Sequence, residues 1–324
     1  MARALITGIS GFVGPYLTAH LRSQKIECVG VSRLPRDPKH PVSLEDVRIH
    51  EIDIRDRREL RRVIEEERPD LVFHLAAISH VPTSRDNPEL VFDVNVTGTF
   101  NVLESLRQIG SQARIVLVST GNLYGEIDSG AAGFRENDSL RPTSPYATSK
   151  LVGEQIGRSY FEDFGLGVVI ARPFNHTGPG QPPAFACSEF AKSIAAAHVM
   201  SQPSIQLQTG NLKPRRDISD VRDVVRAYAL LASGGVPGEA YNVCSGSMVS
   251  MEQVIDALAE IAQIRVTAQL DPLRVRDREI LRSGGNCSRI REELGWSPEI
   301  PLKETLRDLL RYWVDQCSNR SRRV

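Results

Sequence analysis

Three glycines, spaced three residues apart, lie between an apolar run and a helical pattern near the amino terminus. The run Ala2–Thr7 is typical of a buried strand, and an amphipathic stretch ending near Ser23 follows the glycines. Between a strand and a helix, glycines let the backbone approach a pyrophosphate that is held at the amino terminus of the helix. The spacing differs from Gly-x-Gly-x-x-Gly, and glycine turns are common in α/β proteins. The opening predicts a dinucleotide site made by the loop residues Gly8, Gly11, Phe12, Val13 and Gly14.

The first half of the chain alternates short β-rich runs with helical patterns. The runs that indicate buried strands are Ala2–Thr7, Cys28–Val31, Val47–Ile52, Leu71–Leu75, Ile115–Ser119 and Val168–Ala171. Apolar residues recur at steps of three and four over Gly14–Ser23, Arg57–Glu66, Pro88–Gln108 and Pro145–Phe164. Alternation of this kind predicts an α/β fold, a doubly wound parallel Rossmann sheet with helices on both faces.

The amino-acid composition changes after Arg172, where a Pro- and Gly-rich loop runs to Pro183. Such a loop leaves the sheet at its carboxyl edge, where ligands bind in doubly wound folds. Helical patterns return over Ser188–Met200, Asp220–Leu231 and Ser250–Ala262, around a strand at Ala240–Val243. We expect residues 1–174 and about 219–262 to form the nucleotide-binding domain, about 175–218 and 263–317 a smaller α/β substrate lobe, and 318–324 a solvated tail.

Composition narrows the class of partner. Forty basic and forty acidic residues balance among the 324, so no net field attracts nucleic acid or an anionic membrane. The five cysteines are scattered and never spaced as Cys-x-x-Cys, which favours neither a disulfide framework nor a metal site. The chain has no apolar leader and no run near the ~20 residues of a membrane helix. These features predict a cytoplasmic protein with a small-molecule partner.

Tyr146-Ala-Thr-Ser-Lys150 pairs a phenol with an ammonium group. Residues four apart lie on one face of a helix, and the cation is expected to favour the phenolate and so lower the pKa of the tyrosine toward neutral pH. Thr143 or Ser144 can cap that helix, with Pro145 at its first position. The alternative is a chance Tyr-x-x-x-Lys on an exposed helix. Combined with a dinucleotide site, the pair indicates a redox enzyme.

The ends of three further predicted strands carry groups that suit a dinucleotide. Arg33, after the second strand, can hold a 2′-phosphate, which favours NADPH over NADH although NADH stays possible. Asp53 can accept the adenine amino group, or only cap a helix, and Ile54 can pack on the ring. After the fourth strand, small residues let the cofactor lie close or pack tightly with each other: Leu75, Ala76 and Ala77.

These residues, taken in order, resemble the extended short-chain dehydrogenase/reductase family over nearly the whole chain. The matching motifs include Gly8-x-x-Gly11-x-x-Gly14, Leu75-Ala-Ala77, Asn95-Val-Thr-Gly98, Tyr124-Gly125, Tyr146-x-x-x-Lys150 and Arg172-Pro173. The resemblance extends to members that reduce the C4 ketone of GDP-4-keto-6-deoxy-D-mannose to GDP-D-rhamnose. It implies that Thr120 hydrogen-bonds the sugar carbonyl, that Tyr146 donates the proton, and that Lys150 orients the ribose. No metal is needed.

The resemblance also implies where substrate and cofactor bind. Pro173 and His176 would line the nicotinamide end, although a lone histidine is often structural. Arg216 would bind the diphosphate of a GDP-linked keto-deoxyhexose, and Asn175 a sugar or phosphate oxygen. In the charge run 271–279, Glu279 can pair with guanine and Arg274 can stack or reach phosphate, unless the run is a solvated face. The remaining substrate residues are His80 and Asn122.

Two other functions stay open. A GDP-mannose 4,6-dehydratase or nucleotide-sugar epimerase would use the same scaffold and keep its cofactor bound. Dehydratases carry a glutamate where this chain has the neutral Asn122, which argues for reduction. A dinucleotide-sensing protein without turnover would not need Tyr146 and Lys150 together. Family members usually form homodimers through a four-helix bundle, which implies pairing of the helices near Pro88–Gln108 and Pro145–Phe164 here.

Overall fold

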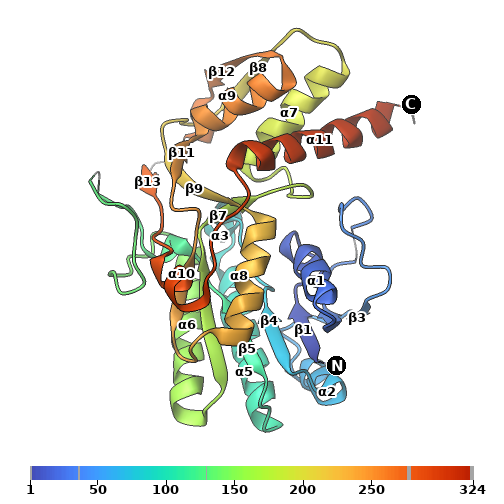
Figure 1. Ribbon diagram of the computed structural model, residues 1–324, viewed down its shortest axis with the longest axis vertical. Helices are drawn as coiled ribbons and strands as arrows, with labels where there is room; N and C mark the ends of the chain where they lie inside the picture. The colour runs from blue at the N-terminus through green and yellow to red at the C-terminus, as the bar shows by residue number, and fades with distance from the viewer. Residues whose placement is uncertain (1, 36, 129, 276–278, 322–324) are drawn as a thin grey trace.

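The computed structural model describes residues 2–35, 37–128, 130–275 and 279–321. A large lobe surrounds a parallel sheet of seven strands, and a smaller lobe stands on the carboxyl edge of that sheet (Figure 1). The sheet order is β10-β6-β5-β4-β1-β2-β3, so the direction of winding reverses between β1 and β4. This confirms the doubly wound parallel sheet. The strands are β1 Arg3–Thr7, β2 Glu27–Val31, β3 Arg48–His50, β4 Leu71–His74, β5 Arg114–Val118, β6 Gly167–Pro173 and β10 Ala240–Val243.

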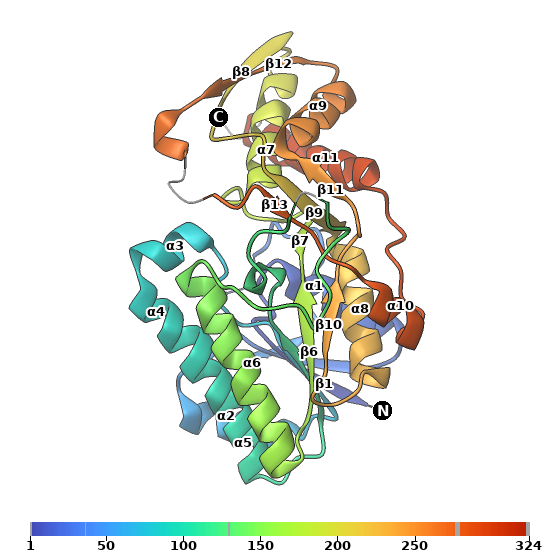
Figure 2. The ribbon, with the colours of Figure 1, turned by 90° about the vertical axis from the view of Figure 1, so that its left-hand side faces the viewer.

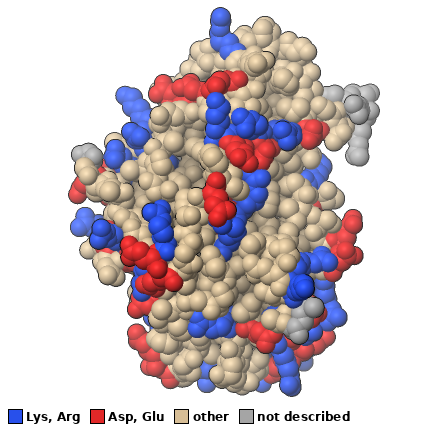
Figure 3. Space-filling view, viewed as in Figure 1, with Lys and Arg blue, Asp and Glu red and all other residues tan. Residues whose placement is uncertain are grey.

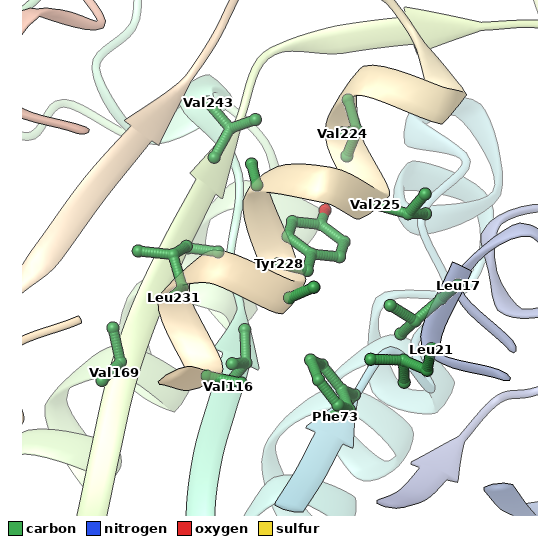
Figure 4. Close-up of a cluster of buried hydrophobic side chains, with 14 of the residues drawn as sticks. Leu17, Leu21, Phe73, Val116, Val169, Val224, Val225, Tyr228, Leu231 and Val243 are labelled. Atoms are coloured by element: carbon green, nitrogen blue, oxygen red, sulfur yellow. The ribbon is translucent and has the colours of Figure 1, made fainter. Parts of the chain in front are cut away.

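Helices cover both faces of the sheet because its strands are apolar on both sides. In β1, Ile6 packs in one core cluster and Leu5 in another on the opposite face. Figure 4 shows the first face, where strand residues such as Phe73 meet helical residues such as Leu17 and Leu231. That face is covered by α1 Val13–Ser23 and α8 Val221–Gly234, and the other by α2 Arg57–Glu67, α5 Gly98–Gln108 and α6 Pro145–Phe164.

The helix expected over Pro88–Gln108 contains a π-helical turn. It comprises α4 Pro88–Phe92, the π turn Asp93–Thr97 and α5, and α3 Val81–Asp86 precedes it. The turn holds Asn95, whose Nδ2 donates to Ser149 Oγ at 2.9 Å and whose Oδ1 accepts from the amide of Ile78 at 2.8 Å. The π turn therefore ties α6 to the loop after β4.

The smaller lobe has its own core. Its helices are α7 Ala186–Val199, α9 Met251–Ala262 and α11 Leu302–Ser321, which pack against one another. Figure 1 shows them beside the two-stranded sheet of β8 Ser204–Thr209 and β12 Arg265–Leu270. A second small sheet joins the lobes and contains β7 Asn175–Thr177, β9 Arg215–Asp220, β11 Met248–Ser250 and β13 Arg282–Ser283.

The chain crosses between the lobes at different points from those expected. The helix predicted at Ser250–Ala262 does not return to the large sheet, because Val254, Ile255 and Leu258 of α9 pack in the small-lobe core. Conversely, α10 Ser288–Leu294 packs on β10 and α8 through Ile290. Amphipathic periodicity shows that a helix has a buried face but not which core receives it.

The tail is shorter than expected, since α11 continues to Ser321; residues 322–324 lie outside the described part of the chain. Acidic and basic side chains are interspersed on the face drawn in Figure 3. Among the residues described, none of the helices has the length and apolar character to cross a membrane. Within the described residues, two short 3₁₀ turns lie at Gly121–Leu123 and Pro272–Arg274.

Candidate active site

Two cavities meet at the carboxyl edge of the sheet. One, of about 420 Å³, extends over the glycine loop, and the other, of about 610 Å³, lies between that edge and the smaller lobe. Both are lined by the same residues where they meet: Ser79, Asn122, Asn175, His176, Gln181 and Phe185. The cavities therefore form one cleft with two arms, which we call the nucleotide arm and the lobe arm.

The glycine loop provides a bare backbone surface at the start of α1. Gly8 has a φ of 73°, and a Cβ there would lie 2.8 Å from the Cα of Ala76. A Cβ on Gly14 would lie 2.1 Å from the carbonyl oxygen of Ile9. No side chain caps α1, so its first amide groups are free to bind an anion. The loop thus fits a pyrophosphate, and every predicted cofactor residue lines the nucleotide arm.

The far end of the nucleotide arm carries the two groups expected to meet the adenosine. Arg33 is well exposed, and its Nε lies 4.0 Å from Asp53 Oδ2. Asp53 is already paired with Arg55 at 2.7 Å, which holds the pKa of the carboxyl below its usual range. Asp53 does not cap α2, because Asp56 accepts the amide hydrogen bond of Glu59. Arg33 is thus the cation available for a 2′-phosphate.

The proton-transfer pair lies on the first turns of α6. Ser144 caps this helix by accepting from the amide of Ala147 at 3.1 Å, and Pro145 starts it, as the sequence indicated. Tyr146 and Lys150 are both buried and line the nucleotide arm. Thr120 hydrogen-bonds the Tyr146 side chain. Among the described residues Lys150 Nζ has no hydrogen-bond partner, which suits an ammonium group that binds ribose hydroxyls.

Because Tyr146 and Lys150 are buried, the pKa of Tyr146 differs from the value that the sequence predicted. The sequence predicted a lowered pKa for Tyr146, but burial raises it to about 12, against the opposing hydrogen bond from Thr120. Burial also lowers the pKa of Lys150 to about 8, against the opposing charge of Glu154. Desolvation disfavours the charged form of both groups. Tyr146 therefore keeps its proton at neutral pH, which suits an acid rather than a base.

The predicted substrate residues all line the lobe arm, although five of them already have partners, among them Asn175, which donates to the carbonyl of Asp217 at 3.3 Å. Glu279 accepts from Asn211 at 2.7 Å, and Arg274 pairs with Glu189 at 2.6 Å. Arg216 donates to the carbonyl of Ile280 at 2.6 Å, and His80 contacts Thr83 at 2.9 Å. The complete set is His80, Asn122, Asn175, Arg216, Arg274 and Glu279.

The structure adds residues that the sequence analysis did not assign. Arg85 on α3 and Phe185 before α7 line the lobe arm, and Phe185 meets the His80 ring edge-on at 5.8 Å. Gln181 bonds the carbonyl of His176 at 2.9 Å and lines both arms. His176 stacks on Phe12 with 6.1 Å between ring centroids. The motif at 172–181 could have signalled Gln181, but Arg85 and Phe185 depend on how the lobes fold together.

The parallel sheet, the glycine loop and the Tyr146–Lys150 pair define a dinucleotide-dependent oxidoreductase of the short-chain dehydrogenase/reductase type. The model of the family described as GDP-mannose 4,6 dehydratase matches residues 5–309, and the chain belongs to that family.

Curated relatives and solved structures resemble the chain over its full length. A GDP-6-deoxy-D-mannose reductase of Pseudomonas aeruginosa is 35% identical over 96% of this chain and 97% of its own. A GDP-mannose 4,6-dehydratase of Vibrio cholerae is 26% identical over 95% and 92%. The structure of RMD from Pseudomonas aeruginosa complexed with NADPH superposes with a TM-score of 0.84, at 33% identity over 98% and 100% of the two chains. A Thermus thermophilus UDP-glucose 4-epimerase complexed with NAD has a TM-score of 0.83, at 29% identity over 96% and 98%.

Proposed function

We propose that the protein catalyses the NADPH-dependent reduction of the C4 ketone of GDP-4-keto-6-deoxy-D-mannose to GDP-D-rhamnose, in nucleotide-sugar biosynthesis. The observation that carries the proposal is the position of Thr120 and Tyr146. They lie in the nucleotide arm beside Asn122, which lines both arms. A sugar in the lobe arm can therefore present its carbonyl to both hydroxyls, and the reductase and RMD relatives support this substrate and cofactor.

The roles of the residues follow from their ionisation. Tyr146 holds its proton at neutral pH and can deliver it to the oxygen of the ketone as that oxygen gains charge. Thr120 donates a second hydrogen bond to the same oxygen. Lys150 binds the ribose hydroxyls and, when charged, stabilises the phenolate left behind. The nicotinamide, when bound, supplies the hydride.

Asn122 separates reduction from dehydration. A GDP-mannose 4,6-dehydratase must remove a ring proton, and the family places a glutamate at this position for that step. An amide has no lone pair basic enough to accept this proton near neutral pH. The dehydratase relatives at lower identity make this the second candidate, and Asn122 argues against it.

The lobe arm suits a nucleotide diphosphate. Arg216 lies on β9 at the wall of the arm, where its guanidinium can bind phosphate oxygens. In the same arm, the Glu279 carboxylate can accept from guanine N1 and N2, while the Arg274 guanidinium can stack on the base or reach a phosphate. Binding would then replace the present partners of these groups, Asn211 and Glu189.

The test is a spectrophotometric assay with enzymatically generated GDP-4-keto-6-deoxy-D-mannose. Consumption of NADPH absorbance at 340 nm, formation of GDP-D-rhamnose and loss of both in Tyr146→Phe are the expected results. NADH serves as the cofactor control. Conversion of GDP-mannose itself, with bound cofactor that is not consumed, would instead establish the dehydratase.

The protein would act as a homodimer. The helices α4, α5 and α6 lie side by side on the outer face of the large lobe (Figure 2). Each of these helices carries an exposed aromatic ring, namely Phe92, Phe100 and Phe164. Such a surface suits pairing of two copies in a four-helix bundle. Light scattering should give twice the chain mass, and Phe100→Lys with Phe164→Lys should give the monomer.

We also expect the enzyme to work in the cytoplasm. Cys28, Cys187, Cys244 and Cys287 are buried thiols that form no disulfide within the described part of the chain. A reducing compartment keeps such thiols free. Cell fractionation of the native host tests this location.

A further inference from the structure

Tyr228 is a buried residue whose hydroxyl the proposed function leaves without a role. The residue lies on α8, is 1% exposed and packs in the apolar core between this helix and the sheet. Figure 4 shows its ring among Phe73, Leu21 and Leu231, with the hydroxyl directed toward the side of Val224 and Val225. The same residue lines the nucleotide arm of the cleft. The hydroxyl therefore stands at the boundary between core and cleft.

No described residue hydrogen-bonds this hydroxyl, unlike those of other buried tyrosines. Tyr124 donates to Asn242 at 2.8 Å, and Tyr160 donates to Glu104 at 2.9 Å. Tyr241 donates to Glu293 at 2.6 Å and accepts from the amide of Val236 at 3.1 Å. Because Tyr228 lines the cleft, its hydroxyl is available to a bound ligand, and phenylalanine would fill the same apolar space without offering that hydrogen bond. A tyrosine here indicates a partner that enters through the cleft.

Ser119 offers a second hydroxyl of this kind. It follows β5 directly, is 3% exposed, and its Oγ has no hydrogen-bond partner in the described part of the chain. It lines the same arm as Tyr228, and α8 packs against β5. The two hydroxyls therefore reach the same arm from two neighbouring elements, β5 and α8.

The reacting end of the nucleotide arm is the place where these hydroxyls lie. Ser119 precedes Thr120, and the electrostatic influence of Tyr146 reaches Tyr228. Burial raises the pKa of Tyr228 strongly, so the phenol stays protonated and can donate. The adenosine end, marked by Arg33 and Asp53, lies across the glycine loop, at the ends of β2 and β3 on the far side of β1. The ligand group at Tyr228 is thus near the hydride carbon and not the adenine.

We propose that Tyr228 and Ser119 are positioning residues that bind the carboxamide of the nicotinamide ring. Tyr228 donates to the amide oxygen, and Ser119 accepts from the amide nitrogen. An amide suits the pair because it offers one acceptor and one donor in fixed geometry. Held at this substituent, the ring presents one fixed face to the substrate ketone. The inference rests on the dinucleotide site of the proposed function.

The test compares stability and binding in variants of the ligand-free protein. Calorimetry measures the Kd of NADP⁺ and of its 3-acetylpyridine analogue, in which a methyl replaces the amide nitrogen. Tyr228→Phe should weaken both ligands about 3- to 10-fold, because both keep the oxygen. Ser119→Ala should weaken NADP⁺ by a similar factor and leave the analogue unchanged. Without ligand, Tyr228→Phe should melt at the wild-type temperature or above it.

Tyr241→Phe is the matched control, since it is equally buried but loses two hydrogen bonds far from the cleft. It should melt lower by about 2–4 °C and bind both ligands as wild type does. Unchanged binding by Tyr228→Phe, or melting lowered as in the control, would overturn the inference while leaving the reductase intact. A wild-type protein that binds no NADP⁺ would overturn the proposed function as well.

Discussion

Arg172 and Glu154 form an ion pair that is almost completely removed from solvent. Arg172 Nη2 lies 2.7 Å from Glu154 Oε2, and the two side chains are 3% and 1% exposed. Arg172 also donates to the hydroxyl of Tyr124 at 2.8 Å and to the carbonyl of Glu136 at 2.9 Å. The pair joins β6 to α6 one turn beyond Lys150, so it supports the helix that carries Tyr146 and Lys150.

Removing one charge of this pair should destabilise the protein strongly. Glu154→Gln leaves the guanidinium buried without its counter-ion, and we expect a loss of about 3 kcal/mol in the free energy of unfolding. Glu65→Gln is the control, because its pair with Arg61 at 2.7 Å is nearly half exposed on both sides. That change should cost less than about 0.5 kcal/mol. Urea unfolding followed by circular dichroism measures both, and equal losses would contradict the burial argument.

Lys150 should set the upper pH limit of catalysis. Its pKa of about 8 means that the ammonium loses its proton as pH rises through that value, while Tyr146 stays protonated to about 12. Reductase kcat should therefore fall above about pH 8. Lys150→Arg, which stays charged, should remove this fall even if the rate is lower. An unchanged pH profile in Lys150→Arg would assign the limit to another group.

Lys150 should also make the free energy of unfolding depend on pH, but this quantity should rise with pH where kcat falls. The folded pKa of Lys150 lies near 8 and its ordinary value is 10.5, so the unfolded chain binds more protons between these limits. The contribution of Lys150 to the free energy of unfolding should rise with pH across this window. Lys150→Met removes the titrating group. From pH 7.5 to 10, the free energy of unfolding of the wild-type protein should therefore rise relative to that of Lys150→Met. A constant difference would mean that Lys150 titrates normally.

Arg33 should decide between the two nicotinamide cofactors. Arg33→Ser removes the exposed cation and should raise the KM for NADPH about tenfold, since a charge-assisted hydrogen bond contributes ~1.5 kcal/mol. The KM for NADH should change little, because NADH has no 2′-phosphate. Arg22→Ser is a control on the neighbouring helix outside the cleft. A parallel change for both cofactors would assign Arg33 to the shared adenosine.

Gly8 should tolerate no side chain because two effects coincide there. Its φ is 73°, and an added Cβ would lie 2.8 Å from the backbone of Ala76. Gly165, after α6, has a similar φ of 70° but open space around a Cβ. Gly165→Ala should cost about 1 kcal/mol from backbone strain alone and leave NADP⁺ binding intact. Gly8→Ala should cost more and weaken NADP⁺ binding in calorimetry; equal effects would exclude the close approach as the cause.

Local patterns in the sequence determined much of the fold and of the nucleotide arm. Strand runs, helical periodicity and the spacing of Gly8, Gly11 and Gly14 predicted the parallel sheet and its ligand edge, because parallel strands and their connecting helices must bury both faces of the sheet. Tyr146 and Lys150 share a helix face by spacing alone, and the sequence limited the cap to Thr143 or Ser144, of which the structure shows Ser144.

Only the tertiary structure decided what depends on distant segments meeting. It placed α9 in the smaller lobe and α10 on the sheet, since an amphipathic helix can bury its face in either core. It paired Arg274 with Glu189 across 85 residues. It also raised the pKa of Tyr146, because desolvation depends on everything packed around the phenol, whereas the spacing to Lys150 reports one neighbour.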